Sequence, residues 1–307
     1  MTKLFLLLGL TLSVGLSPVL ASETPHVFVS ILPQRTFVER ISGDLVEVSV
    51  MVMPGASPAT YEPTPRQMTT LTKARAYFAV GVPFEKTWLP RITSVNPDMD
   101  VIHTDQGIEK RPMAAHEHHS GAVRDDHEAP PGHQGEERGQ RQGGIRDPHI
   151  WLAPGLVKVL ARNIHDGLVR IDPDHSDAYA HNLDRFLDEI DRLDQTLSTI
   201  FARFPEDQRS FMVFHPAWGY FADQYGLHQI PIESQGKEPS PKQLVDIVKR
   251  GRDKGISVIF VQPQFSDASA GVIAREMGAE VVPLDPLAED WAGNLLRAAR
   301  AFERALE

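Results

Sequence analysis

The chain has 307 residues, 41% of them hydrophobic, and a formal net charge of −10, so it can bury one large or two medium hydrophobic cores. The negative charge argues against a nucleic-acid partner, which would require a basic face, and against electrostatic docking on anionic lipid. Cysteine is absent. That excludes disulfides, thiolate metal sites and cysteine nucleophiles, and leaves His, Asp and Glu as the strong metal ligands.

Residues 1–21 are predicted to be a secretory signal peptide. Lys3 supplies a short positive region, an apolar run extends from Leu4 to Leu16, and small residues precede Ser22. A membrane anchor is the alternative, but the apolar run is shorter than the ~20 residues that a span requires. We therefore expect a soluble periplasmic protein. Without cysteine it cannot be a lipoprotein.

Residues 22–150 predict an N-terminal α/β lobe. Strand-like apolar segments alternate with segments of helical periodicity, which indicates parallel sheets built from βαβ units. The expected strands are His26–Leu32, Leu45–Val52, Ala76–Gly81 and Met99–Asp105, and the expected helices are Pro33–Gly43, Pro65–Ala74 and a segment around Trp88.

A histidine-rich insertion, from about Gly107 to Arg146, interrupts this pattern. It lacks aromatic residues and cannot bury enough apolar surface to offset the entropy of ordering, so we expect it to be disordered. Clustered neutral imidazoles favour weak metal binding near pH 7 over an inert linker. The histidines concerned are His116, His118, His119, His127 and His133.

Residues 151–207 predict a helical region that leads to a C-terminal α/β lobe at 208–307. One amphipathic helix covers Gly155–Ile171, and a second runs from after Pro173 to about Phe204, which would span ~45 Å. A coiled-coil arm is one interpretation. Because βα alternation resumes directly afterwards, we favour a rigid helix that joins two α/β lobes, each with a mostly parallel sheet flanked by helices. The later strands are expected to begin at Ser210, His228, Ser257 and Ala279.

Candidate ligands follow from sheet geometry, because ligands of open α/β sheets bind beyond the carboxyl ends of the strands. His215 and Asp285 directly follow predicted strands, Glu62 lies in a loop after a strand, and His149 precedes a helix. Imidazole nitrogen and carboxylate oxygen suit Zn²⁺. Each residue alone also has an ordinary explanation, such as a surface histidine, a helix cap or a turn-forming aspartate.

Six sequence blocks taken together are more specific. In chain order they are SPATYEPTPRQ from Ser57, DPHIWLAP from Asp147, FHPAWGYFADQYGL from Phe214, EPSPKQL from Glu238, FVQPQFS from Phe260 and VVPLDPL from Val281. In these blocks the chain resembles the metal-binding solute-binding proteins of zinc and manganese ABC importers, the zinc-uptake branch especially. The resemblance covers essentially the whole chain after the signal peptide.

The resemblance implies a metal site in the cleft between the lobes, with His149, His215 and Asp285 as ligands. The family's first histidine ligand falls on Ala59, which cannot bind metal. The family's glutamate in the FVQPQFS block is replaced by Gln262, which we do not expect to bind metal. Water, a histidine of the insertion (His116, His118 or His119 among them) or Glu62 remain candidates for the fourth position.

The expected function is therefore capture of a divalent metal, zinc rather than manganese, by a monomer that passes it to the membrane permease of an ABC importer. A zinc-dependent hydrolase with Glu62 as base is one alternative, although the chain has no HExxH helix and no nucleophile elbow. A metal chaperone, adhesin or sensor without high-affinity uptake is another, and Ala59 keeps it open.

Overall fold

The computed structural model describes residues 24–113, 146–205, 208–233, 237–265 and 268–306. The predicted signal peptide and all five histidines of the insertion lie outside these ranges, whereas residues 107–113, at the start of the predicted insertion, lie within them. None of the helices within the ranges is long and apolar enough to cross a membrane.

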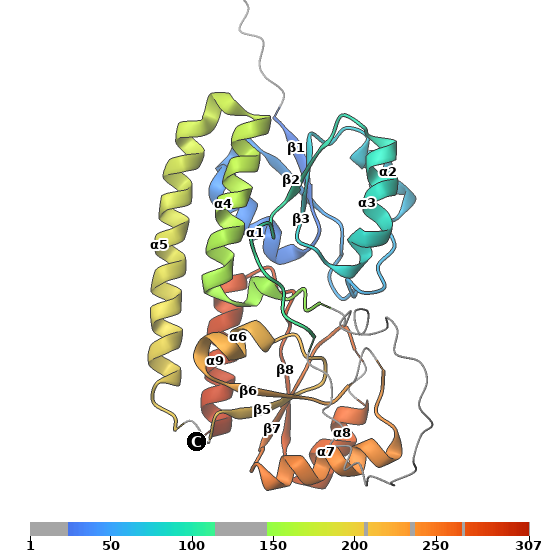
Figure 1. The fold of residues 1–307 in the computed structure, drawn as a ribbon, viewed down its shortest axis with the longest axis vertical. Coiled ribbons are helices and arrows are strands. Elements are labelled where there is room, and N and C mark those ends of the chain that lie inside the picture. Colours follow the sequence, from blue (N-terminus) through green and yellow to red (C-terminus); the bar gives the residue numbers. More distant parts are fainter. Residues whose placement is uncertain (1–23, 114–145, 206–207, 234–236, 266–267, 307) are drawn as a thin grey trace, which may run out of the picture.

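The first lobe contains a four-stranded parallel sheet with the order β2-β1-β3-β4. Helices cover both of its faces (Figure 1), and the central strand β3 is buried along its whole length, as expected for a sheet covered on both sides. Its strands are β1 (His26–Val29), β2 (Glu47–Val50), β3 (Ala76–Ala79) and β4 (Asp100–His103), and its helices are α1 (Leu32–Ser42), α2 (Pro65–Leu71) and α3 (Pro83–Val95).

The second lobe repeats this winding, with the parallel strand order β6-β5-β7-β8. Its strands are β5 (Ser210–Val213), β6 (His228–Pro231), β7 (Val258–Val261) and β8 (Glu280–Pro283), and its helices are α6 (Gly219–Tyr225), α7 (Pro241–Asp253), α8 (Ala268–Met277) and α9 (Trp291–Leu306). In both sheets the strand order reverses beside the first strand, so the switch point of the second lobe lies between β5 and β7, where ligands of such sheets bind.

A repeated helix start supports the correspondence between the lobes. The sequences EPTPRQ from Glu62 and EPSPKQ from Glu238 begin α2 and α7. In each, the hydroxyl of the N-cap (Thr64 or Ser240) accepts a hydrogen bond from the backbone N–H three residues later, and the glutamine there accepts one from the N-cap backbone N–H. This capping box satisfies two backbone donors that the first turn leaves unpaired.

The helices α4 (Pro154–Ile171) and α5 (Ser176–Phe201) join the lobes. The 26-residue helix α5 is ~39 Å long and packs against α1 and α4 on the first lobe and against α6 and α9 on the second (Figure 1). Its apolar stripe is thus buried by both lobes, which confirms the predicted connecting helix in place of a coiled-coil arm. The stripe consists of Tyr179, Phe186, Ile190, Leu193, Leu197 and Phe201.

Helix α4 approaches the first sheet closely at Gly167. A Cβ atom there would lie 2.7 Å from Ile102 Cδ1 and 2.8 Å from Phe78 Cε1. We predict that Gly167→Ala lowers the free energy of unfolding by ~1–3 kcal/mol, since added volume forces a packed core apart. Urea denaturation of the metal-free protein measures this.

Gly271→Ala is the matched control, because a Cβ on that helical glycine meets only Arg275 Nη1, at 3.6 Å. It should be neutral or stabilising by up to ~1 kcal/mol through helix propensity. Equal effects of the two substitutions would contradict close packing at Gly167.

Candidate metal centre

His149 is held by the buried carboxylate of Asp147. Asp147 Oδ1 accepts hydrogen bonds from the His149 backbone N–H, at 3.1 Å, and from ring Nδ1, at 2.8 Å. Since a carboxylate only accepts, Nδ1 carries the proton and Nε2 keeps a free lone pair. Burial lowers the pKa of the His149 imidazole, although Asp147 opposes the shift. The ring is therefore neutral near pH 7, as a metal ligand must be.

Asp147 is itself fixed by its neighbours. Its backbone N–H donates to Arg111 O at 2.9 Å, its carbonyl accepts from the Tyr220 hydroxyl at 3.0 Å, and its Oδ2 lies 3.5 Å from Arg111 Nε. Gly219 makes room for this ion pair, because a Cβ at that position would lie 2.5 Å from Arg111 Nη2. The residue that orients His149 is thus anchored to α6 of the second lobe through its backbone carbonyl, while its carboxylate lies beside Arg111.

His215 lies two residues beyond the end of β5 and is held at three points. Its Nδ1 lies 2.7 Å from Oε1 of Glu233, a buried carboxylate just beyond β6. Gln262, just beyond β7, accepts from the His215 backbone N–H at 3.0 Å and donates to its carbonyl at 2.9 Å. The ring also stacks on Phe265 with centroids 4.7 Å apart. The carboxyl ends of three adjacent strands therefore determine where this imidazole lies.

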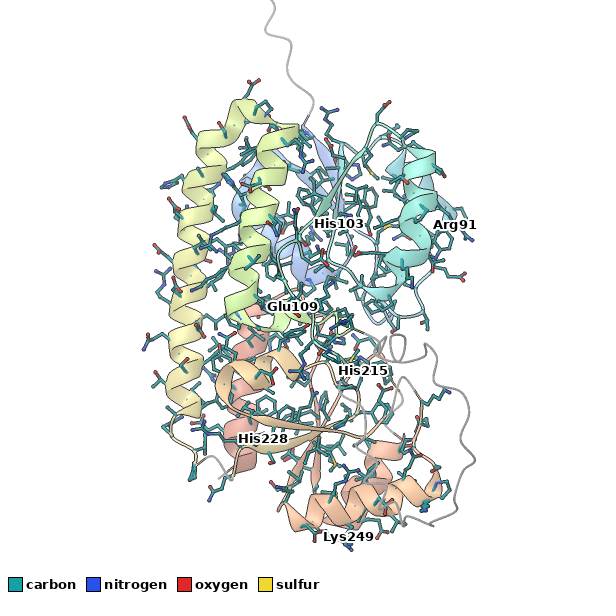
Figure 2. The ribbon with its side chains drawn as sticks, viewed as in Figure 1. Arg91, His103, Glu109, His215, His228 and Lys249 are labelled. Atoms are coloured by element: carbon teal, nitrogen blue, oxygen red, sulfur yellow. The ribbon has the colours of Figure 1, made fainter. Side chains whose placement is uncertain are left out.

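The two imidazoles meet between the lobes. Their ring centroids are 5.2 Å apart with an interplanar angle of 72°, and Figure 2 shows His215 at the junction of the lobes. The side chains of His149 and His215 are 10% and 16% exposed, so solvent reaches the pair without surrounding it. Each ring uses Nδ1 for a carboxylate and leaves Nε2 available.

Asp285 follows β8 and is also held through one of its oxygens. Its Oδ1 accepts from Gln264 Nε2 at 2.8 Å and from the Leu287 backbone N–H at 2.9 Å, while Asn294 Nδ2 donates to its carbonyl at 2.6 Å. Within the described ranges, no three His, Asp or Glu side chains form a group that could already hold a metal ion. The structure therefore brings His149 and His215 together, and Asp285 does not form a ready three-residue metal group with them.

Ala59 and Glu62 lie in the loop between β2 and α2, and both are exposed. The loop is held by its own lobe, where the Phe84 N–H donates to Pro58 O at 3.1 Å and Tyr61 packs edge-on against Phe84. Glu62 lies two residues before Thr64, the N-cap of α2.

Sequence reasoning did not single out Asp147 or Glu233. Asp147 could have been found locally, because it stands two residues before His149. Glu233 comes 18 residues after His215, and its signal is only that it ends the segment HQIPIE, whose strand neighbours β5. The side-chain amide of Gln262 bonds to the backbone N–H and carbonyl of His215 and so positions this residue.

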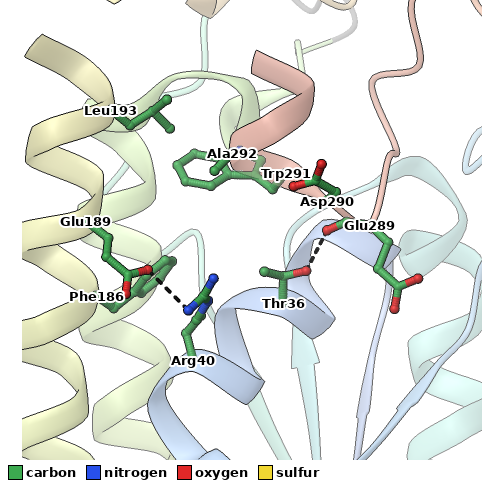
Figure 3. Close-up of a pocket in the computed structure, with 9 residues that line it drawn as sticks. All are labelled: Thr36, Arg40, Phe186, Glu189, Leu193, Glu289, Asp290, Trp291 and Ala292. Carbon is green, nitrogen blue, oxygen red and sulfur yellow. Dashed lines mark hydrogen bonds and ion pairs between the residues drawn. The ribbon is translucent and has the colours of Figure 1, made fainter. Parts of the chain in front are cut away.

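A separate cavity of about 400 Å³ lies where α1, α5 and the start of α9 meet (Figure 3). Thr36 donates to Glu289 O at 2.6 Å across it, and Arg40 pairs with Glu189 at 3.4 Å. Its lining contains no histidine and its charged groups are paired, so it is not a second metal site. The lining residues are Thr36, Arg40, Phe186, Glu189, Leu193, Glu289, Asp290, Trp291 and Ala292.

Comparison with known proteins points to one family. Residues 27–305 match the family described as zinc-uptake complex component A, periplasmic (ZnuA). A putative metal-binding protein of Chlamydia muridarum (strain MoPn / Nigg) is 31% identical over 301 residues, which cover 97% of this chain and 98% of that protein. The high-affinity zinc uptake system protein ZnuA of Bacillus subtilis (strain 168) is 27% identical over 266 residues, covering 85% and 78%. A crystal structure of ZnuA matches with a TM-score of 0.81 at 40% identity, covering 93% of this chain and 100% of that chain.

We predict that His149 of the metal-free protein is the neutral Nδ1–H tautomer at pH 7 and titrates below 6.5, the ordinary value. Since the unfolded chain then binds more protons than the folded one, the free energy of unfolding should fall as pH drops from 6.5 toward the folded pKa. Nitrogen-15 chemical shifts of the ring measure both tautomer and titration.

The same ring in the urea-unfolded chain is the reference and should titrate near ~6.5. A protonated Nε2 at pH 7 in the folded protein would contradict the assignment.

Proposed function

The chain belongs to the periplasmic zinc-uptake component A family, and from that premise we propose that it binds one zinc ion between its lobes through His149, His215 and Asp285. The family consists of solute-binding proteins for metal uptake and not of enzymes. The family match confirms the resemblance seen in the sequence, and the match to the ZnuA crystal structure confirms the two-lobed α/β fold. The observation that carries the proposal is the pair of imidazoles, each fixed at Nδ1 by a buried carboxylate, with ring centroids 5.2 Å apart.

The proposed ligands share one arrangement. Each uses one polar atom for the protein and keeps one for a cation: Nε2 of His149, Nε2 of His215 and Oδ2 of Asp285. A partner on the second ring nitrogen orients the ring and raises its basicity, as carboxylates do for metal-bound histidines. The expected set is therefore two nitrogens and one oxygen at ~2.0–2.2 Å from the ion.

This donor set favours zinc over manganese. Imidazole suits zinc, whereas manganese prefers carboxylate, carbonyl and water oxygens. With Ala59 in place of a ligand, we propose that water completes the tetrahedron, as it does at open zinc sites. A histidine of the insertion, such as His116, His118 or His119, is the next candidate. Glu62 ranks last because the family resemblance gives no reason to expect a ligand at that position.

The family suggests where the protein acts in the cell and where it delivers the metal. We propose that residues 1–21 direct export, that the mature protein is a periplasmic monomer, and that it delivers the ion to the membrane permease of an ABC importer. We also propose that it does not catalyse hydrolysis. The two carboxylates nearest the imidazoles, Asp147 and Glu233, are engaged by the rings, so neither is free to act as a base on a bound water.

Removing the proposed ligands tests this function. We predict that His149→Ala, His215→Ala and Asp285→Ala each weaken zinc binding by at least ~100-fold, measured by competition with a chelator, since each removes one metal bond. The two histidine variants also leave a buried carboxylate, Asp147 or Glu233, without its imidazole partner. Native mass spectrometry of the unsubstituted protein should show one zinc.

His228→Ala is the matched control, because His228 lies far from the lobe junction, on β6 (Figure 2). It should bind zinc like the unsubstituted protein. If all three ligand variants did the same, the proposed site would be wrong.

The fourth position has its own test. We predict that Ala59→His tightens zinc binding by at least ~10-fold, because an imidazole replaces a water at an otherwise complete site. The measurement is repeated after deletion of residues 114–144. If water is the fourth ligand, deletion alone leaves the affinity unchanged. Weaker binding after deletion, restored by Ala59→His, would instead assign the position to the insertion.

A further inference from the structure

Two buried tryptophans connect the segment after His149 with the segment after Asp285. The Trp151 indole N–H donates to Pro286 O at 2.8 Å, and the Trp291 indole N–H donates to Trp151 O at 2.7 Å. Both indoles are almost fully buried. The two hydrogen bonds thus join residues that are 135 and 140 positions apart in the chain. Water could replace these bonds only by entering the core.

Trp151 also touches the imidazole directly. Its ring centroid lies 5.3 Å from that of His149, and its acceptor Pro286 is the residue next to Asp285. A single side chain therefore contacts one proposed ligand and bonds to the neighbour of another. We propose that Trp151 is a positioning residue that sets the separation of Asp285 from His149, and so determines whether the carboxylate can join the imidazoles on a metal ion. This rests on the ligand set proposed above.

The surroundings of Trp151 make the spacing stiff. Trp291 packs edge-on against Phe37 of α1, with centroids 5.2 Å apart, and lies at the lobe junction beside α1 and α5 (Figure 3). Thr36 of the same helix donates to Glu289 O at 2.6 Å. Asn294 holds the carbonyl of Asp285. The segment from Asp285 to Glu289 is therefore held from both lobes, and Trp151 is the contact nearest the imidazole.

The spacing matters because Asp285 is not already grouped with the imidazoles. A carboxylate whose Oδ1 is held by Gln264 and Leu287 cannot compensate for a shifted backbone by choosing another rotamer without losing those bonds. Metal–oxygen bonds tolerate only about ±0.2 Å. Loss of the Trp151 bond should therefore reduce the contribution of Asp285 and leave the two imidazoles in place.

The test compares Trp151→Phe with Trp218→Phe. Both replace a buried indole by a phenyl ring, but Trp218 Nε1 has no hydrogen-bond partner among the described residues, so only the first removes a bond. We expect Trp151→Phe to weaken zinc binding by ~10–100-fold, the usual effect of losing an outer-shell contact, and Trp218→Phe to leave it near that of the unsubstituted protein. Competition with a chelator measures zinc, and manganese is titrated in parallel.

Two further readouts separate positioning from general destabilisation. In the Asp285→Ala background, Trp151→Phe should have no additional effect on zinc affinity, because coupled residues are not additive. The preference for zinc over manganese should also rise in Trp151→Phe, since manganese depends more on the carboxylate oxygen. If Trp151→Phe does not fold, Trp291→Phe, which removes the bond to Trp151 O, should give a smaller effect in the same direction.

The outcomes distinguish the two proposals. Additive effects in the double variant, or equal affinities of Trp151→Phe and Trp218→Phe while Asp285→Ala weakens binding, would overturn the role of Trp151 and leave the metal site standing. Normal zinc binding by Asp285→Ala would overturn both Asp285 as a ligand and Trp151 as its positioning residue. No zinc binding by the unsubstituted protein would overturn the proposed function itself.

Discussion

An imidazole ring has two nitrogens, and at both histidines of the lobe junction a buried carboxylate occupies Nδ1 and so leaves Nε2 for another partner. The bond serves both partners. A carboxylate as buried as Asp147 or Glu233 is costly unless it is hydrogen-bonded, and each imidazole requires a fixed orientation to present Nε2. The pairing therefore stabilises the charges in the core and selects the tautomer that a metal needs.

The supports of these pairs come from the topology. Parallel strands bring their carboxyl ends to one edge, so β5, β6 and β7 supply His215, Glu233 and Gln262 to the same place. The Asp147–His149 segment instead reaches the site from the chain that leads into α4, and it is anchored on α6. Because α5 is buried against both lobes, the two halves of the site share one continuous core.

Sequence patterns predicted the alternation of strands and helices and the long connecting helix, because these depend on local periodicity. The position of His215 after a strand also made it a candidate ligand, whereas its combination with His149 was implied by the family resemblance. Boundaries were less predictable: the long helix ends at Phe201, where periodicity suggested about Phe204. The partnership of His215 with Glu233 and the bond from Trp151 to Pro286 join residues distant in the chain, and no local pattern encodes them.

In the proposed site, Ala59 stands where the family resemblance implies a histidine ligand, and the other three candidates do not depend on its loop for support. Each of the three remaining candidates is supported from elsewhere: His149 by Asp147, His215 by Glu233, and Asp285 by residues around β7, β8 and α9. The loop that carries Ala59 is held by its own lobe. Since none of the hydrogen bonds that orient these ligands comes from that loop among the described residues, a histidine can be lost there while the frame of the site persists. The number of ligands and the rigidity of the frame are therefore separable properties of this fold.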